Sequence, residues 1–216
     1  RLTFTLDADD DSLFSVDPEM TADGLLTFAT ADDAYGTATV AISLDDETNT
    51  VSDSFTITLN PVNDAPTFIM GANQTVWEDC GIQTVPGWGT SLYEGADNED
   101  GQSLWFETES HNTSLYTASG LPAIESTGKL IYTPAANANG TDYVTVTLND
   151  DGDTLYGGIH STTYEYAWIT VLPVNDQPSF IDLDDITVSE DSGTYNKPWV
   201  QAGSISVCPT DEAGQT

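Results

Sequence analysis

The chain has 216 residues with 36 acidic and only 3 basic side chains, which gives a formal net charge of −33 at pH 7. Nucleic acids and anionic membrane surfaces are bound through clustered basic side chains, so we expect neither as a partner. A compact chain this anionic repels itself, which predicts a need for high salt, for bound divalent cations or for wide spacing of the charges along an elongated body.

Short segments in which apolar and polar residues alternate recur along the whole chain. A period of two predicts half-buried antiparallel strands, and no segment has the period of an amphipathic helix. The pattern predicts an all-β fold of tandem immunoglobulin-like antiparallel β-sandwiches. In chain order, the apolar positions of the main strands are Leu2, Phe4 and Leu6; Val40, Ile42 and Leu44; Phe55, Ile57 and Leu59; Val144, Val146 and Leu148; and Ala167, Ile169 and Val171.

The sequence repeats itself, which indicates an array of similar domains. Pro61-Val-Asn-Asp64 returns as Pro173-Val-Asn-Asp176, and Asp23–Phe28 matches Thr127–Tyr132. The outer parts of the chain complement each other, so we expect one period of a longer tandem chain, or a polymer whose neighbours complete each other's sandwich. The predicted regions are 1–63, the later part of one repeat; 64–175, one complete repeat; and 176–216, the beginning of another.

The sequence shows no initiating Met, no signal peptide and no apolar run long enough to cross a bilayer. We therefore expect no membrane insertion in this segment, and we expect the chain to be an internal piece of something larger.

Acidic residues and Asn gather at the ends of the predicted strands and in the linkers. Clustered carboxylate and amide oxygens suit Ca²⁺, which takes about six to eight oxygen ligands in irregular geometry, whereas Mg²⁺ is less well suited. The alternative is that Asp and Asn serve here as turn formers and solvated surface groups. The candidate metal ligands are Asn63, Asp64, Glu78, Asp79, Asp97, Glu99, Asp150, Asp151, Asn175, Asp176, Glu190 and Asp191.

The order of several short motifs resembles a cadherin repeat. Ala96-x-x-Glu99-x-Gly101 is followed by Ser126-Thr-Gly-Lys-Leu130 and Tyr143-Val-Thr-Val-Thr-Leu-Asn-Asp150, and Val174-Asn-Asp-Gln-Pro-Ser-Phe180 ends the unit. The chain is still more similar to the bacterial cadherin-like and immunoglobulin-like tandem repeats of large surface adhesins and extracellular fibres, whose units end in Val-Asn-Asp-x-Pro. The Leu-Asp-Arg-Glu segment of true cadherins is absent, and residues 134–140 take its place.

This resemblance implies an array of cadherin-like β-sandwiches that is stiffened by Ca²⁺ and lies outside the cell or on its surface. The function it implies is structural or adhesive, as part of a fibre, stalk or adhesin, with neighbouring copies of the same repeat as partners. The linker residues and the two equivalent glutamates, Glu78 and Glu190, are the ligands that the resemblance implies between successive repeats.

Residues 64–175 carry tryptophans where the sibling repeats carry Ser or Thr. Trp77, Trp105 and Trp168 are placed by the strand alternation on the side away from the core, and an extra loop adds Tyr156 and Tyr164. Exposed aromatic rings mark interfaces or sugar-binding platforms, so we predict a lateral contact surface, with binding of surface glycans as the alternative function. The competing interpretation is that each Trp covers a neighbouring strand and shields the sheet edge.

The sequence also contains two cysteines and three sequons. Cys80 and Cys208 are not expected to pair within one repeat, so each is either free and buried or cross-links domains or chains. Sequons at Asn73, Asn112 and Asn139 are compatible with glycosylation outside the cell. We find no nucleophile elbow and no phosphate-binding loop, so the chain is not expected to be an enzyme.

Overall fold

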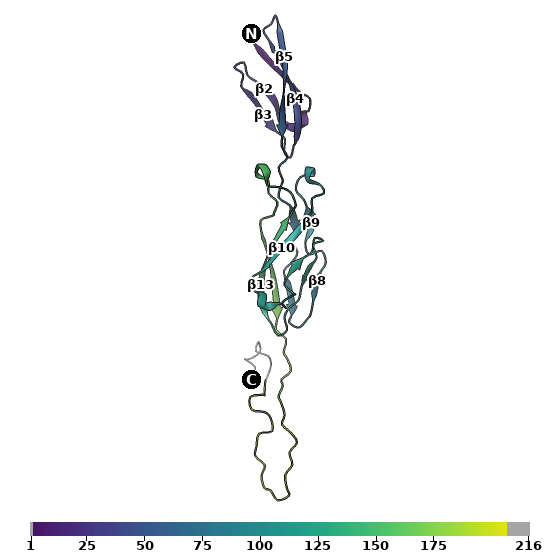
Figure 1. Cartoon of the computed structure of the whole chain (residues 1–216), viewed down its shortest axis with the longest axis vertical. Coiled ribbons are helices and arrows are strands. Elements are labelled where there is room, and N and C mark those ends of the chain that lie inside the picture. Colours follow the sequence, from purple (N-terminus) through teal and green to yellow (C-terminus); the bar gives the residue numbers. More distant parts are fainter. Residues whose placement is uncertain (1, 207–216) are drawn as a thin grey trace. The chain divides into compact units, whose positions relative to one another are not determined.

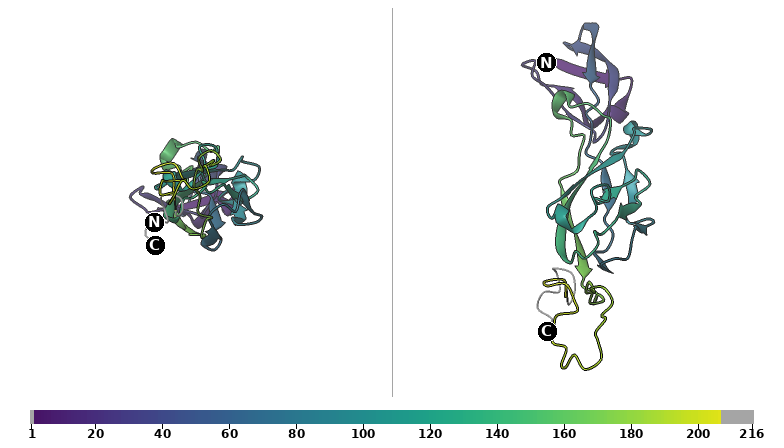
Figure 2. Two further views of the ribbon diagram at one scale, coloured as in Figure 1. Left: turned by 90° about the horizontal axis from the view of Figure 1, so that it is seen from below. Right: turned by 60° about the horizontal axis from the view of Figure 1, so that its bottom comes forward.

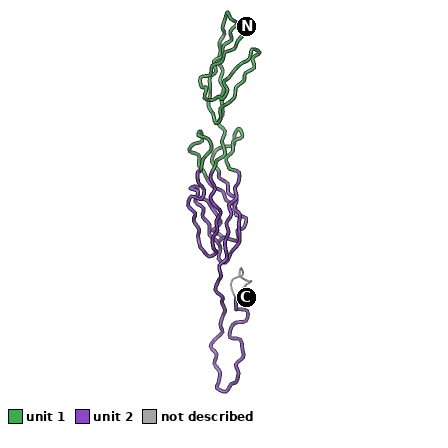
Figure 3. The backbone as a smooth tube through the Cα atoms, turned by 180° about the vertical axis from the view of Figure 1, so that it is seen from behind, with its two compact units in different colours: residues 1–67, 92–104, 149–162 green, residues 68–91, 105–148, 163–216 purple. Residues whose placement is uncertain are grey.

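Figure 1 shows the computed structural model, which describes residues 2–206. The chain divides into two compact units (Figure 3): unit 1 contains residues 1–67, 92–104 and 149–162, and unit 2 contains residues 68–91, 105–148 and 163–216. Strands joined by turns and short 3₁₀ segments make up the described residues, among which no α-helix occurs, so the prediction of an all-β fold is confirmed. The boundaries predicted between the three repeats stay a prediction.

Unit 1 contains a three-stranded antiparallel sheet in the order β1-β4-β5 and a two-stranded sheet that pairs β2 with β3. Its buried core consists of Leu13, Phe14, Ala38, Val40 and Ile57. The elements are β1 (Thr3–Ala8), η1 (Asp11–Leu13), β2 (Phe14–Met20), β3 (Leu26–Thr30), β4 (Gly36–Asp45), β5 (Thr50–Leu59), η2 (Asp97–Glu99) and η4 (Leu155–Gly157).

Unit 2 contains a four-stranded sheet in the order β10-β13-β14-β7 and a three-stranded sheet in the order β11-β12-β8. The teal and green strands in Figures 1 and 2 belong mostly to this unit. A further pair joins β6 to β9. The elements are β6 (Thr67–Ile69), β7 (Gln74–Trp77), β8 (Gln83–Val85), β9 (Thr90–Tyr93), β10 (Trp105–Ser110), η3 (Thr113–Leu115), β11 (Ala123–Ile124), β12 (Leu130–Tyr132), β13 (Gly140–Asn149) and β14 (Glu165–Leu172). The buried core is Trp88, Leu115, Tyr116, Ile124, Leu130, Tyr132, Val144, Val146, Ala167 and Ile169.

The strand alternation predicts burial well in unit 2 and less well in unit 1. Val144, Val146 and Leu148 on β13 are all at most 2% exposed. On the corresponding strand β4, Ile42 and Leu44 are only half-buried. The second sheet of unit 1 is the two-stranded β2-β3 pair, whereas unit 2 has a three-stranded second sheet in addition to the β6-β9 pair.

One turn is repeated in detail at the start of β4 and of β13. Gly36 and Gly140 have φ values of 139° and 138°, in the region that favours glycine. A Cβ at either position would lie 3.5 Å from a leucine methyl group, of Leu13 and Leu115 respectively. The two repeats therefore share local packing as well as sequence.

Candidate functional site

Five residues of unit 1 gather around the linker position Asn63, and we name them the junction cluster: Asn63, Asp64, Glu99, Gln102 and Asp150. Asn63 is buried, and its Nδ2 donates to Asp150 Oδ1 at 3.1 Å and to the Ile159 carbonyl at 2.7 Å. Gln102 Nε2 donates to Asn63 Oδ1 at 2.8 Å. The linker is thus held by side chains from two loops that are far apart in the sequence.

The second linker residue is held through its backbone. The Asp64 N–H donates to Glu99 Oε1 at 2.7 Å, and the Ala96 N–H donates to Glu99 Oε2 at 3.2 Å. The Asp64 side chain stays exposed. Nearby, the Ser103 N–H donates to Asp151 Oδ1 at 2.8 Å. Glu99 and Asp151 therefore fix the loops, while the Asp64 carboxylate remains available to a ligand.

The junction cluster contains buried oxygens that nothing in the described chain satisfies. Asp150 is 1% exposed; its Oδ1 accepts from Asn63 and from the Gly152 N–H, whereas its Oδ2 has no hydrogen-bond partner among the described residues. The same holds for Gln102 Oε1 and Asn98 Oδ1. Buried polar atoms are nearly always paired, so these three acceptors are suited to bind a cation or water.

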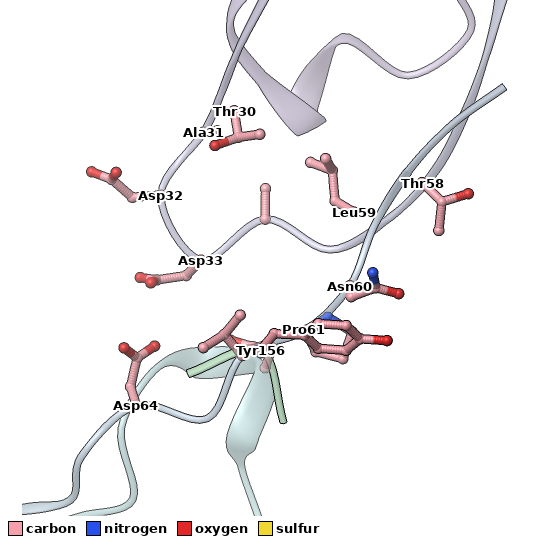
Figure 4. A pocket seen from close by; sticks show the side chains of 13 residues that line it. Thr30, Ala31, Asp32, Asp33, Thr58, Leu59, Asn60, Pro61, Asp64 and Tyr156 are labelled. Carbon is pink, nitrogen blue, oxygen red and sulfur yellow. The ribbon is translucent and has the colours of Figure 1, made fainter. Parts of the chain in front are cut away.

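A pocket of about 520 Å³ opens in unit 1 beside the linker (Figure 4). Its lining includes Asp32, Asp33 and Asp64, whose carboxylates lie on one side of the pocket, and Asn60 and Asn98. As they stand, no three acidic, His or Cys side chains within residues 2–206 are arranged to hold a metal ion. The oxygen donors fit a hard cation in kind, and Ca²⁺ accepts irregular sets that include amides, carbonyls and water.

Unit 2 also has a buried carboxylate that holds a linker, at Glu78. The Glu78 N–H donates to the Leu172 carbonyl at 2.9 Å, and Glu78 Oε1 accepts from the Val174 N–H at 2.6 Å. Glu78 is 2% exposed, and its Oε2 lacks a partner in the part of the chain that the structure describes. Beside it, Asp79 Oδ1 accepts from the Asn137 N–H at 3.2 Å.

Another buried carboxylate of unit 2, Asp142 on β13, is fully paired. Its Oδ1 accepts from the N–H groups of His111 and Asn112 at 3.0 and 2.7 Å, and its Oδ2 accepts from Ser110 Oγ and Tyr116 Oη at 2.7 and 3.0 Å. Burial, and then the neighbouring carboxylate, raise the pKa of Tyr116 far above its ordinary value. Four donors leave Asp142 no unpaired oxygen, so its role is structural.

Exposed rings collect on the outer side of β13 and β14, and we name them the aromatic cluster: His111, Tyr143, Tyr164, Tyr166 and Trp168. His111 stacks on Tyr143 at 4.2 Å between ring centroids, and Tyr143 lies 5.9 Å from Tyr166 and 5.7 Å from Trp168. Tyr164 lies 5.5 Å from Tyr166. Each of the four Tyr and Trp rings is at least 39% exposed.

The middle of the chain matches a known family. The bacterial Ig domain family matches residues 63–162, which include β6 to β13 and both loops of the junction cluster. Residues 63–162 are therefore similar to a bacterial Ig domain. The resemblance to bacterial cadherin-like and immunoglobulin-like repeats is thereby confirmed, and no curated protein matches the chain.

Solved cadherin structures are similar in fold to this chain. The human protocadherin-24 EC1-2 structure (Form II) has a TM-score of 0.52 at 19% identity, over 79% of this chain and 82% of that one. The mouse protocadherin-24 EC1-3 structure has a TM-score of 0.50 at 17% identity, over 83% of this chain and 58% of that one. At such low identity these likenesses show the fold alone.

The structure brings some of the predicted ligands together and not others. Asn63, Asp64, Glu99, Asp150 and Asp151 lie around one linker. Asp97 is exposed and accepts a hydrogen bond from Tyr93 Oη at 3.2 Å, while Glu78 and Asp79 lie in unit 2. Asn175 and Asp176 follow Val174 in the next linker, and Glu190 and Asp191 are exposed. The role of all these residues as ligands stays a prediction.

Sequence reasoning missed several residues of the site. Asp32 and Asp33 align with Ala136 and Asn137 in the other repeat, so the repeat comparison did not single them out. Gln102 follows the Asp97-Asn-Glu-Asp-Gly run directly, and that position was the available signal. The sequence pattern did not single out Asp142, because this residue lies at an inward-facing position of a strand whose other inward-facing residues are mostly apolar.

The structure places the predicted aromatic contact residues in different parts of the chain. Trp168 and Tyr164 belong to the aromatic cluster, which also contains the unpredicted His111, Tyr143 and Tyr166. Trp77 and Trp105 are 58% and 40% exposed and lie on β7 and β10 of the same sheet, whereas Tyr156 lines the pocket of unit 1. Whether any of them forms an interface stays a prediction.

The candidates for modification are the cysteines and the asparagines of the sequons. Cys80 is exposed and free, so the expectation of a buried thiol is wrong for this residue, and Cys208 lies outside the described residues. Asn73 is exposed, but its Oδ1 accepts the Trp168 N–H at 3.0 Å. None of the described helical segments is long and apolar enough to cross a membrane.

Proposed function

We propose that the chain is a segment of an extracellular structural or adhesive repeat protein, a fibre, stalk or adhesin, whose linkers bind Ca²⁺. Its partners under this proposal are neighbouring copies of the same repeat, and no catalytic role is assigned. The net charge of −33 and the match to the bacterial Ig domain family support the proposal. The observation that carries it is the buried, unpaired Oδ2 of Asp150 beside the linker.

The chemistry of the junction cluster explains how a cation would act there. Asp150 Oδ2, Gln102 Oε1 and the Asp64 carboxylate supply oxygens from two loops and the linker. A bound Ca²⁺ would neutralise the Asp150 and Asp64 carboxylates and tie the linker to the loops, which removes conformational freedom from that backbone. Without the ion, the buried Asp150 oxygen destabilises the fold, because an unpaired buried charge is costly.

The proposal is tested by thermal unfolding of the whole chain in Ca²⁺ and in a chelator. A ligand present at about a hundredfold its Kd stabilises the folded state by about 2.7 kcal/mol, which raises Tm by several degrees. Asp150→Asn keeps the hydrogen bonds to Oδ1 but removes the charge. We expect it to abolish most of the Ca²⁺-dependent rise while leaving the Tm in chelator unchanged or higher.

The matched control is Asp17→Asn, the same change at an exposed site on β2. It is expected to keep the full response to Ca²⁺. A Tm that is identical in Ca²⁺ and chelator, or a response that Asp150→Asn leaves intact, contradicts the proposal.

A second candidate function, binding of a neutral glycan, is favoured by the aromatic cluster. The faces of Tyr and Trp rings attract the C–H groups of sugar rings through the ring quadrupole. Beside the cluster, a shallow hollow of about 320 Å³ is lined by Glu107, Glu109, Thr145 and Thr147. Thr145 also contacts His111, since its Oγ1 lies 2.9 Å from Nε2. Rings next to hydroxyls and carboxylates suit a polyhydroxylated ligand, and the carboxylates repel an anionic one.

Native affinity electrophoresis tests this candidate with soluble β-glucan, xylan and galactomannan, and with alginate as the anionic comparison. Retardation by at least one neutral polysaccharide is expected, with loss of most of it in Tyr166→Ser/Trp168→Thr. Those are the residues of the sibling repeat at Ser54 and Thr56. Trp105→Thr is the control, since it removes an exposed ring outside the cluster. No retardation, or equal retardation of the double variant, refutes glycan binding.

A further inference from the structure

The three sequons of the central repeat differ in how the fold uses their asparagines. Asn112 precedes the 3₁₀ segment η3, where its Oδ1 accepts from Ser114 Oγ at 2.7 Å and its Nδ2 donates to the Thr141 carbonyl at 3.3 Å. The sibling repeat has the same arrangement before η1, where Ser12 Oγ donates to Asp10 Oδ1. The Asn-x-Ser pattern at Asn112 is therefore explained by a local cap that the sibling forms with Asp-x-Ser.

The sequon at Asn139 is also explained by the fold. Its other two residues, Gly140 and Thr141, recur in the sibling repeat as Gly36 and Thr37. The glycine has the positive φ of the turn that both repeats share. The Thr141 hydroxyl oxygen lies 3.4 Å from a threonine hydroxyl oxygen of β14, as that of Thr37 lies 3.1 Å from one of β5. The Gly-Thr part of this sequon thus serves the strand pairing.

The sequon at Asn73 has no such structural explanation. Asn73 is exposed; its Oδ1 accepts the Trp168 N–H at 3.0 Å, and its Nδ2 donates no hydrogen bond within residues 2–206. Thr75, which completes the sequon, is exposed on β7, the edge strand of the larger sheet. In the last repeat the equivalent of Asn73 is Asp185, so the repeat does not require an amide here. The amide nitrogen of Asn73 is thus exposed and available.

Asn73 lies at one end of a row of exposed rings that crosses the sheet. β7 and β14 run parallel, and the contact of Asn73 with Trp168 comes one residue before their first paired positions. On the next strand Tyr143 lies opposite Trp168, with 5.7 Å between the ring centroids, and His111 stacks on Tyr143. A group attached to Asn73 Nδ2 would therefore leave the chain beside the aromatic cluster.

The sequon and the row of rings are absent together from the flanking repeats, as far as the sequence contains them. The equivalents of Trp168, Tyr143 and His111 in the first repeat are Thr56, Thr39 and Asp9, and the equivalent of Asn73 in the last repeat is Asp185. The fold forms without any of these four residues. Their joint presence in the central repeat indicates that they serve one purpose.

We propose that Asn73 is the attachment site of an N-linked glycan whose first sugars pack against Trp168 and Tyr143. The donor is an oligosaccharide carried on a polyprenyl diphosphate, and an oligosaccharyltransferase catalyses the step. Asn73 Nδ2 attacks the anomeric carbon and loses one proton; a C–N bond forms, the bond from that carbon to the phosphate oxygen breaks, and the polyprenyl diphosphate leaves. The inference goes beyond the proposed function and uses only its extracellular location.

The rings give the attached sugar a surface to cover. Trp168 and Tyr143 are 47% and 39% exposed, and the faces of such rings attract the C–H groups of a sugar. The covalent bond holds the sugar beside the rings at a high effective concentration, so that even a weak contact is populated. In the chain without this modification, the same rings stay open to the external glycan of the second candidate function.

The first test offers the folded whole chain to a purified single-subunit oligosaccharyltransferase with a polyprenyl-diphosphate oligosaccharide, and mass spectrometry maps the modified residues. We expect modification of Asn73 and little of Asn112 and Asn139, because the fold engages those two sequons. Synthetic peptides of the three sequons are the control, since outside the fold all three sequences are acceptors. Thr75→Ala removes the sequon hydroxyl and is expected to abolish modification of Asn73.

The second test asks whether the attached sugar contacts the rings. Hydroxyl-radical footprinting is expected to oxidise Trp168 severalfold more slowly in the modified chain than in the same reaction without donor. Trp105, an exposed ring outside the aromatic cluster, is the internal control and is expected to be oxidised equally in both. The sugar is also expected to raise Tm by about 2–4 °C, an increase that Trp168→Thr removes and Trp105→Thr retains.

Three results overturn the proposal: a folded chain in which Asn73 stays unmodified, equal modification of all three asparagines, or oxidation of Trp168 at the same rate with and without the sugar. Asn73→Gln is expected to keep the full response of Tm to Ca²⁺, because the junction cluster takes no part in the modification. A Ca²⁺-dependent Tm in a chain that is not modified at Asn73 would therefore retain the cation proposal and reject this site alone.

Discussion

At one equivalent position the two repeats bury different chemistry, a carboxylate in residues 64–175 and a methyl group in residues 1–63. Asp142 is 1% exposed and accepts a hydrogen bond from Tyr116 Oη at 3.0 Å. Its counterpart is Ala38, which is 0% exposed, and the counterpart of Tyr116 is Phe14. The carboxylate and the hydroxyl that bonds to it are therefore absent together.

This paired difference shows which interactions the fold requires. Leu13 and Leu115 occupy the same turn in both repeats, so the apolar packing is common to them. The polar pair is an addition that one repeat has and the other lacks. A buried network is stable only when every member is satisfied, which explains why both partners differ at once. The comparison leads to four predictions, from the largest effect to the smallest.

Removing the carboxylate alone is expected to have the largest effect. Asp142→Ala leaves Tyr116 Oη, Ser110 Oγ and the Asn112 N–H without this acceptor, while the His111 N–H keeps the Tyr143 carbonyl at 3.3 Å, so we expect a loss of about 3–5 kcal/mol in the free energy of unfolding. Urea unfolding followed by tryptophan fluorescence measures it, because residues 1–63 contain no Trp and Trp88 is 3% exposed. Glu109→Ala, an exposed carboxylate on β10, is the control; an equal loss there would contradict the network argument.

The second prediction concerns replacing Tyr116 and Asp142 together by the residues of the sibling repeat, Phe and Ala. Tyr116→Phe alone is expected to cost about 1 kcal/mol, since Ser110 still donates to Asp142 Oδ2. Combined with Asp142→Ala, it removes a donor that would otherwise be orphaned, so the double variant is expected to lose about 1 kcal/mol less than the sum of the single losses. A double-mutant cycle in urea measures the coupling, and strictly additive losses would show that the two side chains act independently.

The Asp142 network also shows where sequence-based prediction ends. The alternation of β13 correctly predicted that Val144, Val146 and Leu148 are buried, because the period of two assigns a face to each residue. It says nothing about whether loop donors reach an inward Asp. For the same reason the repeat motif grouped Asn63 with Asp64 but missed Gln102, whose contact with Asn63 depends on how the loops fold.

The third prediction concerns alkaline pH. Burial raises the pKa of Tyr132 to about 12, and that of Tyr116 moves in the same direction, whereas residues 1–63 have Phe28 and Phe14 at these positions. Above pH 10 the unfolded chain loses these protons first, so it binds fewer protons than the folded chain and stability falls as pH rises. The contribution is complete below about pH 10 and decreases between about 10 and 12.

Unfolding in urea across this pH range tests it, with tryptophan fluorescence reporting the central repeat and hydrogen exchange reporting residues 2–60. The central repeat is expected to lose stability steeply and the other region is not. Tyr132→Phe is expected to flatten the slope of the central repeat. A parallel decline in both regions would assign the effect to general charge repulsion instead.

The smallest effect on the free energy of unfolding is expected at the aromatic cluster, where large exposed rings in one repeat correspond to small polar side chains in the other. Tyr166 and Trp168 are each 47% exposed, and their sibling residues are Ser54 and Thr56. Because both rings lie on the exposed face of the sheet and outside the buried core, Tyr166→Ser/Trp168→Thr is expected to change the free energy of unfolding by no more than about 0.5 kcal/mol per residue. A loss of several kcal/mol would show that the rings stabilise the sheet, whereas a near-zero change leaves an external ligand as the reason for them. The same variant in the glycan assay then distinguishes rings that stabilise the sheet from rings that contact a ligand.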